Sequence, residues 1–139
     1  MDMQRIRTTL IRHEGVELKP YRCTSDKLTI GVGRNLDDNG ISQETAMQML
    51  TEDIDAAVED LRRNLSWFDD TPVPVQEALV NLTFNMGMPN LMQFRKTLIL
   101  LRDGAWDKGA DELLDSRYAT QVGYRAREVA DMIRSAADA

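Results

Sequence analysis

Three side chains near the start of the chain are of types that can move protons and bind water. Glu14 is followed after eight residues by Cys23 and after five more by Thr29, within EGVELKPYRCTSDKLTIGVGR. Each also has an ordinary structural interpretation: an exposed carboxylate at a helix end, a small buried thiol, and a β-branched residue suited to a strand. Spacing alone leaves both interpretations open.

Four stretches in the same order along the chain decide between them. The Glu, Cys and Thr spacing resembles the signature of the phage-type lysozymes, the muramidases of glycoside hydrolase family 24, which places Asp or Cys at the second position. FNMG at 84–87, GAWDKGADELLDSRYA at 104–119 and TQVGYRAR at 120–127 resemble the C-terminal lobe of that family. The resemblance therefore covers nearly the whole chain.

This resemblance implies an α+β, lysozyme-like fold with a small β-hairpin lobe joined by a long helix to a mostly helical C-terminal lobe. We expect a single catalytic domain over 1–139, because this length suffices for one compact unit. Its parts would be a hairpin lobe at about 14–45, a connecting helix at about 42–64, and a helical lobe at about 65–139 that also includes the helix 3–13.

The periodicity of apolar residues predicts the individual elements. Steps of three and four predict helices over 3–13 and 42–64, the second with Ser42 as N-cap. Alternation predicts an antiparallel hairpin over 18–34, with one apolar face and an opposite, open face that carries Thr29, Gly31 and Gly33. DDNG at 37–40 predicts a turn. Shorter helices are expected near 75–86, 91–102, 106–115 and 123–135.

The resemblance assigns roles to the three candidate catalytic residues. Glycoside hydrolysis needs an acid for the departing oxygen and a second group that stabilises the transition state or activates water. Glu14 would be the acid, kept protonated by partial burial in a cleft. Cys23 would be a weak base, a group that orients water, or a thiolate nucleophile, and Thr29 would help to position the attacking water. A purely packing role for Cys23 stays open.

Four further residues are expected to bind substrate or support the site. Arg125 matches an arginine that the family places close to the catalytic glutamate, while Gln121 and Phe84 match residues near the cleft. Gly31 would leave open space for the glycan. Trp67, Trp106 and Tyr118 are expected in or near the core, and Arg34 stands where the family usually has His.

Composition excludes several other classes of protein. His13 and Cys23 are the only His and Cys residues, so the sequence predicts no metal site, and we expect no cofactor. The net charge of −6 argues against nucleic-acid binding. Residues 1–34 carry seven Lys or Arg against four Asp or Glu, so these cations either offset repulsion from an anionic wall polymer or form an ordinary solvated surface.

The implied function is hydrolysis of the β-1,4 bond between N-acetylmuramic acid and N-acetylglucosamine in bacterial peptidoglycan, which would cause host cell lysis. Alternatives are a non-catalytic peptidoglycan-binding module and a lytic transglycosylase. The charged start lacks the apolar core of a secretory signal, and no run is long enough to insert stably into a membrane. We therefore expect a monomer held in the host cytoplasm until a separate membrane-permeabilising protein releases it to the wall.

Overall fold

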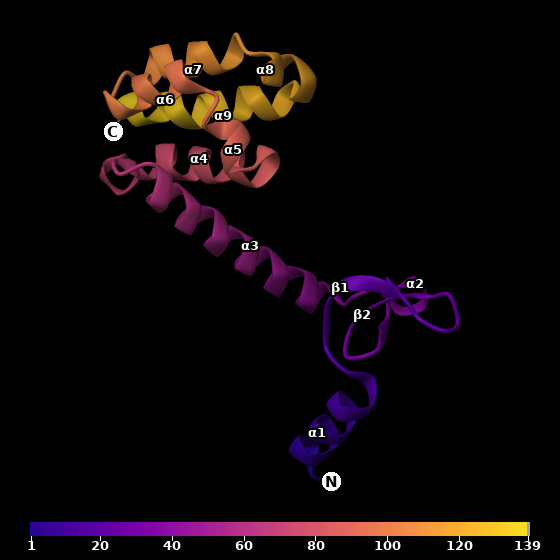
Figure 1. Ribbon diagram of the computed structural model, residues 1–139. Coiled ribbons are helices and arrows are strands. Elements are labelled where there is room, and N and C mark those ends of the chain that lie inside the picture. The colour runs from indigo at the N-terminus through magenta and orange to yellow at the C-terminus, as the bar shows by residue number, and fades with distance from the viewer. Residues whose placement is uncertain (139) are drawn as a thin grey trace. The chain divides into compact units, whose positions relative to one another are not determined.

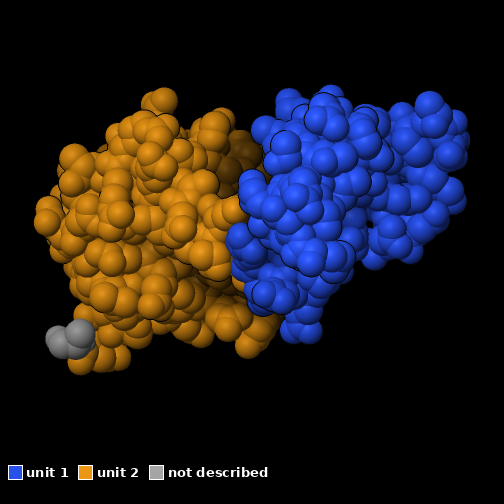
Figure 2. Space-filling view, turned by 90° about the horizontal axis from the view of Figure 1, so that it is seen from below, with its two compact units in different colours: residues 1–48 blue, residues 49–139 orange. Residues whose placement is uncertain are grey.

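The computed structural model describes residues 1–138, which form two compact units, residues 1–48 and 49–138 (Figures 1 and 2). The first unit holds a small three-stranded antiparallel sheet in the order β1-β2-β3, and the second is helical. This confirms the expected α+β class. The helix α3 (Gln43–Asn64) is continuous across the boundary between the units, and its N-cap is Ser42, whose hydroxyl accepts from the Thr45 N–H at 3.1 Å, as predicted.

The helix α1 (Met3–Glu14) opens the first unit and delivers Glu14 at its last position. Asp2 caps its start by accepting from the Arg5 N–H at 3.0 Å. Gly15 ends it with φ +73°, and its N–H donates to the Ile11 carbonyl at 2.8 Å. None of the α1 residues is buried, so the expected packing of this helix within the helical lobe stays a prediction.

The predicted hairpin is formed by β1 (Glu17–Arg22) and β2 (Leu28–Gly31), with Tyr21 opposite Thr29. Pro20 lacks an N–H, and the register is irregular between Glu17 and Tyr21 on this edge strand. A third strand, β3 (Arg34–Asn35), follows a short loop. The helix α2 (Leu36–Asn39) replaces the turn expected at 37–40, because Asn35 caps its start by accepting from the Asp38 N–H at 3.0 Å.

The core lies in the second unit. Its fully buried large side chains come from helices α3, α4, α5, α6, α7 and α9, and they are Leu61, Val75, Leu79, Leu82, Leu91, Leu101, Leu113, Val129 and Ile133. Helices α4 and α9 pack together, and α7 packs against both α6 and α9. Trp67 and Trp106 pack against this core and Tyr118 is part of it, as predicted.

After α3, the helices of this unit are the 3-10 turn Phe68–Asp70, α4 (Val73–Met86), α5 (Met88–Leu91), α6 (Arg95–Arg102), α7 (Trp106–Leu114), α8 (Arg117–Val122), α9 (Tyr124–Ser135) and a 3-10 turn, Ala136–Asp138. The single helix expected near 91–102 is wrong. Pro89 starts the short α5 instead of preventing a helix, because proline is tolerated in a first helical turn. The helix α8 was not expected. Ser116 caps it by accepting from the Ala119 N–H at 3.2 Å.

We expect Leu79→Ala to destabilise the protein by about 2–5 kcal/mol, since it empties a fully buried site in α4. Ile99→Ala in α6 is the matched control, because Ile99 is 47% exposed and should change the free energy of unfolding by less than about 0.5 kcal/mol. Urea denaturation measures both. Equal effects of the two substitutions would contradict this assignment of the core.

Candidate functional site

The end of α1 and the loop that follows β2 hold the Glu14 carboxylate. A Cβ built on Gly33, whose φ is +63°, would lie 2.7 Å from Glu14 Oε2 and 3.0 Å from its Cδ. The carboxylate therefore lies on the face of Gly33 that any other residue would fill. The space beside Gly33 is therefore filled, although the alternation predicts an open position there. Gly33 supports the site through this contact with Glu14, a role that the sequence did not indicate.

Glu14 is exposed, so the first unit does not itself supply the partial burial expected for the acid. A Cβ built on Gly31 would meet no atom within 4 Å, and this glycine does leave the predicted open space.

The turn between β1 and β2 places Cys23 at its start. The Cys23 carbonyl accepts from the Asp26 N–H at 2.9 Å, and the Cys23 N–H donates to the Lys27 carbonyl at 3.0 Å. This closes a three-residue loop in which Asp26 takes the left-handed conformation, φ +58°. Cys23 is half-buried, and backbone N–H groups of its own turn are the main influence on its thiol.

Those N–H groups lower the pKa of the Cys23 thiol below its ordinary value. The Lys27 N–H has the largest effect, followed by the Ser25 N–H, and burial opposes them. Hydrogen bonds to sulfur stabilise the thiolate, which is the nucleophilic and basic form. The local backbone therefore favours a reactive thiol over an inert packing residue.

Thr29 lies beside Cys23, but it does not face open space. Its side chain is only 3% exposed, and its hydroxyl donates to the Lys27 carbonyl at 2.8 Å. The expectation that Thr29 shares an open face with the glycines is wrong, because the side chain turns back onto the hairpin turn. Its oxygen keeps lone pairs that can accept from water or from the thiol.

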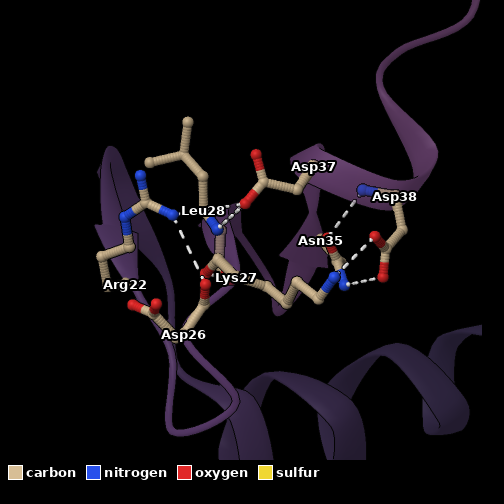
Figure 3. A network of polar contacts seen from close by, with 8 residues as sticks. Arg22, Asp26, Lys27, Leu28, Asn35, Asp37 and Asp38 are labelled. Carbon is tan, nitrogen blue, oxygen red and sulfur yellow. Dashed lines mark hydrogen bonds and ion pairs between the residues drawn. The ribbon is translucent and has the colours of Figure 1, made fainter.

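Three of the basic side chains of residues 1–34 that could offset wall charge are engaged within the first unit. Lys27 lies 3.0 Å from Asp38 (Figure 3), Arg22 lies 3.4 Å from Asp37, and Arg34 donates to the Gly40 carbonyl. The hydrogen bond to Asp38 raises the pKa of Lys27, and the same contact lowers the pKa of Asp38. These cations therefore have partners within the hairpin and α2, besides any role in offsetting the charge of a wall polymer.

The remaining candidate residues lie in the second unit. Phe84, which is 48% exposed, and Arg125 line one groove of ≈ 240 Å³ together with Leu50, Ile54 and Val80. Arg125 donates from Nε to the Asn81 side-chain oxygen at 3.0 Å. The expected pairing of Arg125 with Glu14 would join the two units and stays a prediction.

Gln121 lines a different and larger pocket of ≈ 490 Å³, whose wall includes Phe94 and Tyr118. The Tyr118 hydroxyl donates to the Asn85 side-chain oxygen at 2.8 Å, and burial raises the pKa of this phenol. Asn81 and Asn85 are supporting residues that the sequence did not single out. Both lie in α4, most of which faces the core. A polar residue on such a helix was the signal that could have indicated a supporting role.

The described residues contain neither a metal-binding cluster nor a membrane-spanning helix. Over residues 1–138, no three His, Cys, Asp or Glu side chains are grouped as metal ligands require. Within the same residues, no helix combines the length and the apolar character needed to cross a bilayer.

Comparisons with known proteins identify the family of this chain. The family model for phage lysozyme matches residues 11–133. A relative from Dictyostelium discoideum, described as a probable T4-type lysozyme 2, is 25% identical over 145 aligned positions, which cover 84% of this chain and 85% of the relative. The chain therefore belongs to the phage lysozyme family, a family of peptidoglycan-hydrolysing glycosidases.

Proposed function

We propose that this chain hydrolyses the β-1,4 bond between N-acetylmuramic acid and N-acetylglucosamine, with Glu14 as the acid and with Cys23 and Thr29 acting on the attacking water. The main support is the hairpin turn, which places a thiol of lowered pKa beside a hydroxyl in the same unit that holds Glu14 against Gly33. A packing residue would not need N–H groups directed at its sulfur.

In this mechanism Glu14 donates its proton to the departing glycosidic oxygen as the bond to the sugar breaks. Water attacks the resulting oxocarbenium-like centre from the side that Cys23 and Thr29 occupy. Its proton passes to the Cys23 thiolate, or to solvent where the thiol only orients the water. A thiolate carries the same single negative charge as the aspartate that other members of the family have at this position. The charge at the site is therefore maintained when the thiol is ionised.

We further propose that the second unit contributes Arg125, Phe84 and Gln121 to substrate binding. Arg125 and Phe84 support this because they line one groove, in which an exposed ring stands beside a guanidinium. The glycan would lie over Phe84, and Arg125 would orient the Glu14 carboxylate. Gln121 would contact the part of the substrate that enters the larger pocket.

The biological setting is also a proposal. Hydrolysis of peptidoglycan would cause lysis of the bacterial host, with the protein acting as a monomer. It would stay in the host cytoplasm until a separate permeabilising protein gives it access to the wall, as the resemblance to phage-type lysozymes implies.

Mass spectrometry of digested peptidoglycan tests the reaction type. We expect muropeptides with reducing N-acetylmuramic acid ends, which only hydrolysis yields. Products with 1,6-anhydro ends would instead identify a lytic transglycosylase. Binding without any soluble product would identify a non-catalytic module.

Glu14→Gln should abolish product release while leaving glycan binding intact, because the amide is nearly isosteric but has no proton to give. Turnover measured on purified peptidoglycan, with binding measured by co-sedimentation, separates the two effects. Glu17→Gln, three residues away in β1, is the matched control and should keep its activity. Retained turnover in Glu14→Gln would remove this residue from the mechanism.

Substitution of Cys23 separates its three possible roles. If Cys23 orients or deprotonates water, Cys23→Asp should stay active, whereas Cys23→Ala should lose about 10²–10⁴ in rate. A nucleophilic thiolate would instead give a glycosyl adduct trappable at sulfur. In the wild type the alkylation rate should rise with pH, with a midpoint below the ordinary thiol value of about 8.5, because thiolate forms as pH passes the lowered pKa. A fully active Cys23→Ala protein would leave only a packing role.

Gly33→Ala should displace the Glu14 carboxylate, since the new methyl group would lie 2.7 Å from Oε2. A displacement of about 1 Å can cost about 10²-fold in rate. Gly40→Ala is the control, because Gly40 also has a positive φ but has no atom within 4 Å of a built Cβ. Both variants should lose stability, and kcat per folded molecule should fall in Gly33→Ala alone. Equal kcat values would show that the contact has no role in placing the acid.

A further inference from the structure

One peptide group, the Lys27–Leu28 peptide, connects the two hydrolytic candidates of the hairpin to helix α2. Its carbonyl oxygen accepts from the Cys23 N–H at 3.0 Å and from the Thr29 hydroxyl at 2.8 Å. Its N–H, contributed by Leu28, donates to Asp37 Oδ2 at 2.7 Å (Figure 3). The two ends of the same group are thus held by Asp37 on one side and by Cys23 and Thr29 on the other.

A peptide group is planar, so the direction of its N–H fixes the direction of its C=O. A hydrogen bond to an ionised carboxylate is shorter and stronger than one between neutral groups. It also polarises the peptide and makes the carbonyl a better acceptor. Asp37 therefore has the geometry to fix both the orientation and the acceptor strength of the Lys27 carbonyl.

The surroundings of Asp37 hold it in this geometry. Arg22 lies 3.4 Å from the same carboxylate oxygen, and this guanidinium also donates to the Asp26 carbonyl of the turn. Asp38, the next residue in α2, binds the Lys27 ammonium and accepts from the Asn35 side chain at 2.9 Å. The charged groups that the structure places around the turn are Arg22, Asp26, Lys27, Asp37 and Asp38.

We propose that Asp37 is a positioning residue for the reaction, which holds the Lys27–Leu28 peptide so that its carbonyl fixes the Cys23 N–H and the Thr29 hydroxyl, and with them the turn that carries the thiol. The inference rests on the proposed roles of Cys23 and Thr29. Nothing in it requires Asp37 to touch the substrate.

The test compares Asp37→Ala with Asp37→Asn. Asp37→Ala removes the acceptor of the Leu28 N–H, so the turn should loosen and the alkylation midpoint of Cys23 should move up toward the ordinary thiol value. At pH 7 the rate of alkylation by iodoacetamide should fall about tenfold for a shift of about one pH unit. Asp37→Asn keeps an oxygen that can accept the hydrogen bond, and it should retain most of the wild-type rate. In Asp37→Ala, kcat should fall with little change in KM.

A purely electrostatic role predicts the opposite direction. Loss of a nearby negative charge favours the thiolate, so both variants would then lower the alkylation midpoint. A merely structural role would reduce the melting temperature without moving the midpoint. Either result would overturn the proposal. Asp69→Ala is the matched control, because Asp69 forms a similarly exposed ion pair with Arg62 at 3.0 Å in the second unit, and it should leave the midpoint unchanged.

If Asp37→Ala does not fold, Asp37→Glu replaces it, because it keeps the charge but moves the acceptor by one methylene. It should raise the midpoint, and an unchanged midpoint would overturn the proposal. Alkylation needs no turnover, so the proposal can fail independently of the function. A wild-type protein that yields no peptidoglycan products would refute the proposed hydrolysis, and a raised midpoint in Asp37→Ala would still support the positioning role.

Discussion

The hydrogen bonds of the Cys23–Lys27 turn are the interaction on which the candidate hydrolytic site depends. A three-residue loop brings the N–H groups of Ser25 and Lys27 back to the sulfur, and it gives the Thr29 hydroxyl a fixed acceptor. The loop requires a left-handed residue, and Asp26 takes that conformation although glycine would adopt it at lower cost. The chain thus accepts local backbone strain at the position that orients its only thiol.

The chemistry of the site also depends on two glycines with different tasks. Gly33 permits the Glu14 carboxylate to lie directly on the backbone, whereas Gly31 leaves space that no other group of the chain fills. A side chain at position 33 would have to displace this carboxylate.

Much of the fold was predictable because its signals are local. The step-three and step-four pattern and Ser42 gave the start of α3 correctly, and alternation gave the hairpin. The burial of Thr29 was not predictable, because alternation reports which way a side chain points and says nothing of what covers it. The turn and the short helix α2 lie against β2, and neither follows from period two. The break between α5 and α6 was missed because residues 92–94 contain neither Gly nor Pro.

The catalytic candidates were predictable by type and spacing, and their supporting contacts were not. Asp37 joins Leu28 across nine positions, and Tyr118 joins Asn85 across 33. Such contacts depend on the path of the backbone between the partners.

The Cys23 and Thr29 arrangement, with every group that orients it, lies between Arg22 and Asp38. Forming this arrangement therefore closes only short loops of the chain. Closing loops of this size costs little entropy, and it takes from well under a microsecond to about a few microseconds. The helical core, by contrast, joins segments distant in sequence, such as α4 and α9. The environment of the thiol can consequently re-form after local opening without waiting for the core. Damage to the core would therefore first shorten the lifetime of the folded protein, and only later change the reactivity of the thiol.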